Sequence, residues 1–332
     1  MAVCLVTGGG GFIGSHLVDA LLAAGHQVRV LDNWCTGSPA NLAHVMDRIE
    51  IINGNITDAA IVCQAIRGVE LVFHQAAPAS VKRSVADPLA SHQVCATGTL
   101  QILIAAQGAQ VRRVIYAASS SAYGNPSKLP IRETDQTQPL FPHAVAKLAG
   151  EHYCYSFSQV YGLVTVRLRY FNVFGPRQLP GGPHAAVIPL FLEAMSSGRS
   201  PVIHGDGLQS RDFTCVDDVV QANLLAAEAP RVSGKVFNIA SGLRTNLLDL
   251  VENINENLGT SIRPVHNMPR PGDIRHSQAD ISLAQAELGF CPCTDMKRDL
   301  QRCLQGLDKP RGEALSTAHL QVAGADGPSR LG

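Results

Sequence analysis

The sequence predicts an α/β protein built on a doubly wound parallel sheet, and three observations support this prediction. Short apolar runs alternate with amphipathic segments through the first half of the chain. Each run is apolar over nearly its whole length, as expected for a parallel strand that helices cover on both faces. A glycine-rich turn directly follows the first run and opens the first amphipathic segment.

Six apolar runs are predicted to form strands of the main sheet. In chain order they are Ala2–Thr7, Val28–Asp32, Ile49–Ile52, Leu71–His74, Arg113–Ala118 and Leu163–Arg169. Helical patterns lie between these runs. The first is FIGSHLVDALLAAG, which starts at Phe12 and ends with Gly25, a residue type favoured just after the end of a helix.

The composition of the chain and the length of its predicted elements change from Gly175 onward. The segment FGPRQLPGGPH is rich in proline and glycine and predicts an irregular loop. Shorter helices and strands follow, and we expect residues 175–306 to form mainly a smaller lobe. Within that range, residues 212–240 should return to the larger domain of residues 1–174 through the strand KVFNIA. Residues 307–332 lose hydrophobic periodicity and are predicted to be a flexible tail.

Composition narrows the class of protein. The 27 Lys and Arg residues balance the 27 Asp and Glu residues, so the charge gives no indication of a nucleic-acid or membrane-surface partner. The sequence shows neither a secretory leader nor a run of about 18 apolar residues, which predicts a cytoplasmic protein without a membrane span. The nine cysteines are scattered except for Cys291 and Cys293, and they are interpreted as reduced thiols. A Cys-x-Cys pair with no second pair nearby is weak evidence for a metal, so no metal site is expected.

The glycine-rich turn TGGGGFIG predicts a dinucleotide site. Gly8, Gly11 and Gly14 recur at intervals of three between a strand and a helix. Glycines there allow a tight turn and let a pyrophosphate approach backbone N–H groups at the start of the helix. Asp32 ends the second strand 18 residues after Gly14, where a carboxylate can bind a ribose diol. A carboxylate would repel a 2′-phosphate, so NAD is predicted in preference to NADP.

Several further motifs occur in a fixed order along the chain: LDN, YAASSSAYG, HAVAKLAGE, RYFNVFGPRQ, GDGLQSRDF and RPGDIRHSQAD. Together with the glycine turn they resemble the extended short-chain dehydrogenase/reductase family, and within it the NAD-dependent nucleotide-sugar 4-epimerases. The resemblance covers almost all of the chain from Ala2 to about Cys303. It implies a Rossmann-type NAD domain, a substrate-binding second lobe, a UDP-linked sugar as substrate, and a homodimer formed through the helices that start near Ser84 and His143.

The same resemblance implies the residues of the site. Those expected to bind the cofactor are Gly8, Gly11, Phe12, Ile13, Gly14, Asp32, Asn33, Asn55, Ile56, Gln75, Ala76, Ala77 and Lys147. Those expected to bind the nucleotide sugar are Ser120, Ser121, Asn172, the backbone around Val187, Arg211, Arg270, Asp273 and Ser277. The serine at position 277 is small, which in related epimerases admits an N-acetylhexosamine or a uronate.

The chemistry implied is a reversible oxidation at C4 of the sugar, with Ser119, His143 and Lys147 as catalytic residues. Ser119 would hold the 4-oxygen, and a base one helical turn before Lys147 would remove the hydroxyl proton. Related dehydratases and decarboxylases carry acids immediately after the residue matching Ser119, whereas this chain has Ser120 and Ser121. This difference favours an epimerase.

Three positions depart from the family pattern. His143 stands where the family has its tyrosine base, and none of the six tyrosines has a lysine four residues later. Cys95 replaces an asparagine that lines the cofactor site, and Asn55 replaces an aspartate. A neutral imidazole can accept a proton, and the positive charges of Lys147 and the nicotinamide should keep it neutral. Because imidazole is shorter than phenol, a water molecule or Ser119 would relay the proton.

These departures leave two alternatives open beside an epimerase that works through His143. One is a catalytically impaired homologue that binds NAD and a nucleotide sugar. The other is a nucleotide-sugar dehydratase or decarboxylase, which the missing acids after Ser119 disfavour.

Overall fold

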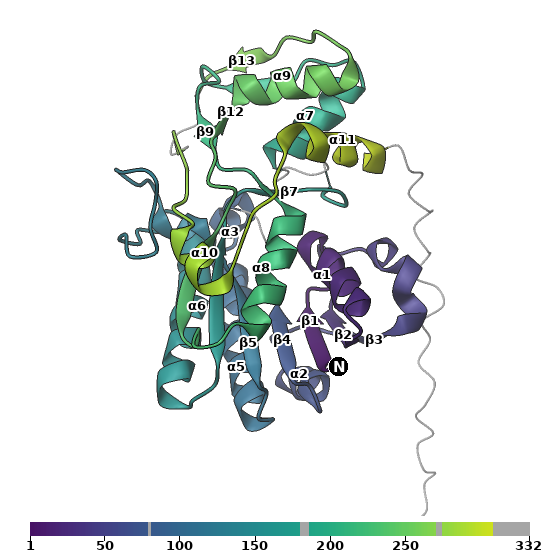
Figure 1. The fold of residues 1–332 in the computed structure, drawn as a ribbon, viewed down its shortest axis with the longest axis vertical. Helices are drawn as coiled ribbons and strands as arrows, with labels where there is room; N and C mark the ends of the chain where they lie inside the picture. The colour runs from purple at the N-terminus through teal and green to yellow at the C-terminus, as the bar shows by residue number, and fades with distance from the viewer. Residues whose placement is uncertain (79–80, 180–185, 270–273, 308–332) are drawn as a thin grey trace, which may run out of the picture.

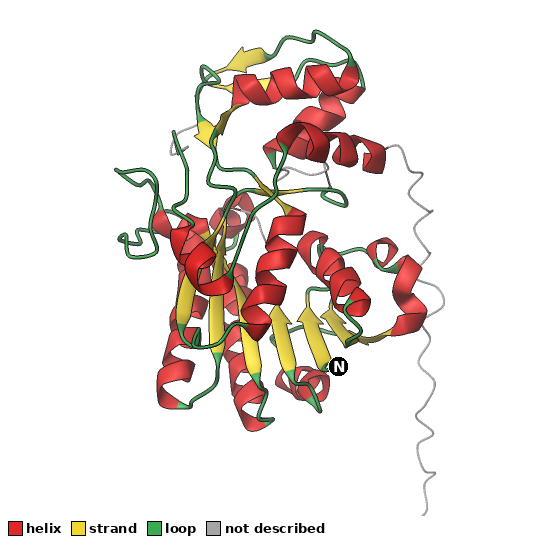
Figure 2. Ribbon diagram, viewed as in Figure 1, coloured by secondary structure: helices red, strands yellow, loops and turns green. Residues whose placement is uncertain are grey.

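A seven-stranded sheet forms the centre of the computed structural model, which describes residues 1–78, 81–179, 186–269 and 274–307. The strand order is β11-β6-β5-β4-β1-β2-β3, and every neighbouring pair is parallel. This arrangement confirms the predicted doubly wound sheet (Figure 2). In chain order the strands are β1 (Val3–Thr7), β2 (Gln27–Asp32), β3 (Ile49–Asn53), β4 (Leu71–His74), β5 (Arg113–Ser119), β6 (Thr165–Tyr170) and β11 (Lys235–Ile239).

The six predicted apolar runs match the first six of these strands to within two residues. The largest difference is at β6, which begins at Thr165 and not at Leu163. Leu163 is buried, but it precedes the first residue of the ladder. Hydrophobicity reports burial, and a residue can be buried before strand pairing begins.

Helices cover both faces of the sheet (Figure 1). On one face α1 (Phe12–Ala23) packs against β1 and β2, and α8 (Val216–Glu228) packs against β5 and β6. A short helix, α10 (Ser282–Leu288), joins this layer beside β11. The other face carries α2 (Ala59–Ile66), α5 (Thr99–Gly108) and α6 (Pro142–Val160). Each layer has its own apolar core against the sheet.

Short helical segments complete the larger domain. The 3-10 turns η1 (Pro39–Asn41) and η2 (Ala43–Arg48) lie between β2 and β3, and η4 (Ser120–Tyr123) follows β5. Two short helices, α3 (Val81–Ala86) and α4 (Pro88–His92), lead through the π-helical turn η3 (Gln93–Gly98) into α5.

A smaller lobe lies beyond the carboxyl ends of the strands, at the top of Figure 1. Its helices α7 (Val187–Ser196), α9 (Leu247–Leu258) and α11 (Met296–Leu307) pack on one another around a third apolar core. Two-stranded pairs complete it: β9 (Ser210–Arg211) with β12 (Thr245–Asn246), and β8 (Val202–His204) with β13 (Val265–Asn267). The chain enters and leaves the lobe more than once, because β7 (Val173–Phe174) pairs with β10 (Thr214–Cys215) and α8 and β11 then follow in the larger domain.

Asp218 joins the two parts of the molecule. This fully buried residue in the first turn of α8 accepts hydrogen bonds from the backbone nitrogens of Cys293 (2.8 Å) and Thr294 (3.0 Å) and from the Thr294 hydroxyl. The segment it holds leads directly into α11 of the smaller lobe. In the part of the chain that the structure describes, no helix is both long and apolar enough to cross a bilayer.

Candidate active site

The glycine turn between β1 and α1 lies in close backbone contact with its surroundings. A Cβ atom at Gly8, where φ is +71°, would come within 2.8 Å of the Ala76 backbone. A Cβ atom at Gly14 would overlap the Gly8 carbonyl oxygen. These glycines therefore allow the turn to fold onto the start of α1. Phe12 and Ile13 lie in the first turn of this helix, where backbone N–H groups favour anions.

Asp32 lies at the carboxyl end of β2, directly beside this turn. Its carboxylate accepts the N–H of Gly10 (2.9 Å) and the N–H of Trp34 (2.8 Å), one on each oxygen. Each carboxylate oxygen can accept a further hydrogen bond. The geometry is therefore compatible with a ribose diol at this acid, and the same carboxylate fixes the glycine turn.

The other residues predicted to bind the cofactor follow the ends of β2, β3 and β4. Asn33 and Asn55 each accept a backbone N–H two residues later, which shapes the loops after β2 and β3, and Ile56 is buried there. Gln75 follows β4 and is held between Asn223 (3.1 Å) and Tyr170 (3.2 Å). The neighbouring residues Ala76 and Ala77 run past the glycine turn, and the Ala76 N–H donates to the Thr7 hydroxyl at 3.2 Å. Ligands of open α/β sheets bind at this edge.

Ser119 and Lys147 meet at the carboxyl end of β5. Ser119 is the last residue of the strand, and its hydroxyl lies 2.7 Å from the Ser121 hydroxyl. Lys147 is buried on α6, and its ammonium donates to the Ala117 carbonyl at 2.7 Å, two residues before Ser119. Burial lowers the pKa of Lys147. Ser120 and Ser121 lie in η4 and present hydroxyls, not acids, after the strand.

His143 lies in the first turn of α6, with 8% of its surface exposed. Its pKa is lowered to about 4, mainly by burial and secondly by the charge of Lys147. The sequence predicted that neighbouring positive charge would lower this pKa. In the structure, burial is the larger cause and the charge of Lys147 is the smaller one. The imidazole is neutral near pH 7 and can accept a proton.

The structure brings into contact two of the three residues that the sequence analysis singled out as departures from the expected pattern. The Sγ atom of Cys95 lies 3.8 Å from the Nδ1 atom of His143. Sequence reasoning missed this pairing because the residues are 48 positions apart and meet only through the packing of α6 against η3.

Gly150, two turns after His143 on α6, was also missed. A Cβ atom there would lie 2.5 Å from the Tyr116 hydroxyl oxygen and 3.1 Å from the Cys95 carbonyl oxygen. The glycine therefore lets α6 approach both β5 and η3. Its position inside a helix, where glycine is unfavourable, was the available sequence signal.

Three of the residues predicted to bind the substrate, Asn172, Arg211 and Ser277, lie in or beside β9. Asn172 donates to the Asp212 carbonyl at 3.1 Å, and the buried Ser277 donates its N–H to the Ser210 carbonyl at 3.1 Å. Arg211 lies between them, half-buried, and Val187 begins α7. Arg270 and Asp273 lie outside the described residues.

Comparison with known proteins gives the family. Residues 4–240 match the model of the NAD dependent epimerase/dehydratase family, which is more than half of the chain. This protein belongs to that family. The resemblance inferred from the motifs is thereby confirmed, and NAD is the cofactor on which the family depends.

The relatives of this epimerase/dehydratase family member include 4-epimerases. It is 40% identical over 292 residues to a UDP-glucose 4-epimerase of Mycolicibacterium smegmatis, covering 87% of this chain and 93% of the relative. It is 36% identical over 300 residues to a putative UDP-glucose 4-epimerase of Methanocaldococcus jannaschii, covering 90% and 96%. A UDP-N-acetyl-alpha-D-glucosaminuronate decarboxylase of Bacillus cytotoxicus is 33% identical over 269 residues, covering 79% and 82%.

Two solved structures are similar over nearly the whole chain. One is a UDP-N-acetylglucosamine 4-epimerase from Methanobrevibacter ruminantium in complex with UDP-N-acetylmuramic acid, with a TM-score of 0.88, 40% identity, and coverage of 92% of this chain and 98% of that one. The other is a UDP-glucose 4-epimerase of Thermus thermophilus in complex with NAD, with a TM-score of 0.84, 33% identity, and coverage of 94% and 99%.

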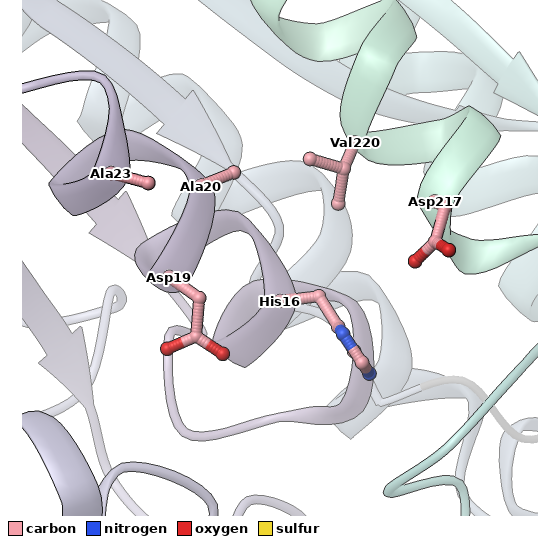
Figure 3. Close-up of a pocket in the computed structure, with 6 residues that line it drawn as sticks. All are labelled: His16, Asp19, Ala20, Ala23, Asp217 and Val220. Carbon is pink, nitrogen blue, oxygen red and sulfur yellow. The ribbon is translucent and has the colours of Figure 1, made fainter. Parts of the chain in front are cut away.

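A separate cavity of about 380 Å³ lies between α1 and α8 of this family member (Figure 3). Its lining residues are His16, Asp19, Ala20, Ala23, Asp217 and Val220. None of them was predicted to bind cofactor or substrate, and Asp19 is already paired with His44 and Arg177. Among the described residues, no group of three or more His, Cys, Asp or Glu is placed to hold a metal ion.

Proposed function

We propose that the protein is an NAD-dependent nucleotide-sugar 4-epimerase in which His143 replaces the usual tyrosine base. The observation that carries the proposal is the arrangement at the end of β5. A neutral, largely buried imidazole lies one turn before a buried lysine, and that lysine bonds to the strand that ends in Ser119.

The residues beside the glycine turn fit NAD. The turn excludes side chains where a pyrophosphate would approach, and Asp32 retains acceptor capacity for a ribose diol. Lys147 would contact the nicotinamide ribose. When bound, NAD supplies the hydride acceptor for C4 of the sugar and the donor for its return.

The protein's own part in the reaction is to bind the sugar and move one proton. Ser119 holds the 4-oxygen by hydrogen bonding, and the Nε2 atom of His143 accepts the hydroxyl proton through a water molecule or the Ser119 hydroxyl. The ammonium of Lys147 favours the negative charge that develops on the oxygen. Once the sugar presents its other face, His143 would return the proton to the 4-oxygen.

The sugar is proposed to carry a UDP group and an N-acetyl or carboxylate substituent. Arg211 and Arg270 supply guanidinium groups suited to diphosphate oxygens. Asn172 and the backbone around Val187 are proposed as further anchors, together with Asp273, which like Arg270 lies outside the described residues. The small side chain of Ser277, which is buried, would admit such a substituent, and a UDP-N-acetylglucosamine 4-epimerase is among the similar structures.

We also propose a homodimer and a cytoplasmic location. Exposed apolar side chains lie on the two neighbouring helices α4 and α6, among them Leu89, Val145 and Tyr153. Burying them in a partner would remove apolar surface from water. All nine cysteines are free thiols, the state that a reducing compartment maintains.

One observation favours a second candidate, a homologue that binds both ligands without turnover. A base with a pKa of about 4 drives proton removal less than a base titrating near neutrality. The dehydratase or decarboxylase alternative gains support from relatives with those activities, but Ser120 and Ser121 offer no acid for the additional proton transfer.

Turnover measurements on three forms of the protein test these candidates. Purified wild type, His143→Phe and His143→Tyr are incubated with NAD and UDP-N-acetylglucosamine, UDP-glucose or UDP-glucuronate, and the galacto epimer is followed by NMR. We expect turnover in wild type, none in His143→Phe, and faster turnover in His143→Tyr. Equal rates in wild type and His143→Phe would exclude His143 as the base, and released water or carbon dioxide would identify the other chemistry.

A further inference from the structure

We propose that Cys95 is a positioning residue for His143: its sulfur accepts the Nδ1–H of the imidazole and thereby leaves Nε2 as the proton acceptor. This inference rests on the proposed function, in which His143 is the base. It assigns a role to a position at which the chain departs from its family.

The contact is a specific one. The sulfur-to-nitrogen distance of 3.8 Å is within hydrogen-bonding reach for sulfur. Cys95 is 1% exposed and His143 is 8% exposed, so water competes weakly for either group. Among the described residues, Cys95 is the one hydrogen-bonding partner of the imidazole.

Three features of the fold create this contact. Cys95 lies in the π-helical turn η3, a local geometry that is frequent at functional sites. Gly150 lets α6 approach the Cys95 carbonyl closely. Small residues pack against the cysteine, since Cys95 lies in one cluster with Ala96, Ala146 and Ala149.

The Cys95 side chain has a second polar neighbour besides His143. The buried Ser91 hydroxyl, one turn earlier, interacts with this side chain. Burial raises the pKa of the thiol, so the sulfur is uncharged near pH 7 and its lone pairs stay available to the imidazole N–H.

The consequence for catalysis follows from the shape of the ring. A neutral imidazole carries one N–H, so a proton on Nδ1 leaves a lone pair on Nε2. Nε2 is the ring nitrogen farther from the backbone, and it comes closer to the reach of a phenol oxygen. Holding the other tautomer would turn the distal nitrogen into a donor and block proton removal.

Nitrogen NMR of the full chain tests the tautomer directly. Wild type, Cys95→Ala and Cys4→Ala are labelled with ¹⁵N-histidine, and His143→Phe identifies the His143 signals. At pH 7 we expect wild type and Cys4→Ala to show a protonated Nδ1 and an unprotonated Nε2. Cys4 is an equally buried cysteine on β1, so Cys4→Ala is the control: it also removes a buried sulfur atom, but not the one that contacts His143. Cys95→Ala should show a mixture of both tautomers.

A turnover assay tests the consequence. Cys95→Ala should lower kcat with KM nearly unchanged, in proportion to the fraction of His143 that carries its proton on Nε2. Cys95→Ser keeps a hydrogen-bond acceptor at this position and should restore the wild-type tautomer. If Cys95→Ala does not fold, the Cys95→Ser variant still tests the inference. A wild-type Nε2–H tautomer, identical tautomers in wild type and Cys95→Ala, or full kcat in Cys95→Ala would overturn the inference. Wild type without turnover would refute the proposed function alone, because the NMR result does not depend on activity.

Discussion

At the scale of single residues, burial determines the chemistry of His143. The imidazole lies against Cys95 in the first turn of α6, and removing it from water disfavours its charged form. The neighbouring ammonium of Lys147 acts in the same direction. The side chain is therefore a neutral base across the physiological pH range, and its lowered pKa should be visible in the pH dependence of the reaction rate.

The first prediction concerns pH. Because the pKa of His143 is lowered to about 4, its active neutral form persists at lower pH than in an ordinary histidine. We expect kcat/KM to stay level from neutral pH down to about pH 5 and to fall as pH approaches 4 and the imidazole takes up a proton. The measurement is kcat/KM against pH in wild type, with Cys4→Ala as the control. An acid limb centred near pH 6.5, the ordinary value, would show that His143 is not buried as described or is not the base.

The sequence predicts which elements carry Ser119, Lys147 and Asp32, because each lies at the end of an apolar run or inside a helical pattern, and the structure has them there. Their roles stay predictions. The sequence motifs could not reveal that Cys95 contacts His143. That contact depends on how closely two helical segments pack, and hydrophobic periodicity reports which face of a helix is buried but not its distance from a neighbour.

At the scale of elements, the absence of a side chain at Gly150 allows α6 to lie close to β5 and η3. The helix carries both His143 and Lys147, so its distance from β5 sets the position of the base. The π-helical turn on its other side had no signature in the sequence, since QVCATG shows no distinctive period.

Gly150→Ala tests this placement. The added Cβ would lie 2.5 Å from the Tyr116 hydroxyl oxygen and 3.1 Å from the Cys95 carbonyl, so α6 must shift. We expect a loss of about 1–3 kcal/mol in the free energy of unfolding, from overpacking, together with reduced kcat. Urea denaturation and turnover assays measure these effects.

Gly108→Ala is the matched control. Gly108 is also helical, ends α5, and has no atom within 4 Å of its ideal Cβ position. This variant should keep full activity and be at least as stable as wild type. Equal behaviour of the two alanine variants would mean that the space beside Gly150 does not constrain α6.

At the scale of the whole molecule, buried polar links hold the smaller lobe to the sheet. Asp218 accepts hydrogen bonds from two backbone nitrogens of the segment that leads into α11. We expect Asp218→Asn to lower the free energy of unfolding by about 3 kcal/mol. The NH₂ group of the asparagine would then face one of the backbone N–H donors of Cys293 and Thr294, and that donor would lose its acceptor. Thermal or urea unfolding measures the loss.

The neighbouring Asp217 is a suitable control for Asp218. Its carboxylate pairs with Arg302 at the surface, and its side chain is 42% exposed. Asp217→Asn should change stability by less than about 1 kcal/mol, as is usual for exposed ion pairs. If both variants lose the same stability, the buried link is not what joins the two parts.

The proposed dimer gives the last prediction. Wild type should have twice the mass of the 35.3 kDa chain in light scattering. Leu89→Asp places a charge among the exposed apolar residues of α4 and α6 and should give monomers. Leu243→Asp, at an equally exposed leucine in the other lobe, should leave the mass unchanged. A monomeric wild type would contradict the proposal.

The position of β11 limits how this molecule can be divided. That outermost strand comes from residues 235–239 and covers the edge of β6, which would otherwise present unpaired backbone groups. A fragment cut after the first six strands would keep the glycine turn and Asp32. Its β6 strand, however, would present unpaired backbone N–H and C=O groups with which other copies of the fragment could pair. Anyone seeking a minimal dinucleotide-binding piece must therefore carry the later strand along or expect the truncated product to aggregate.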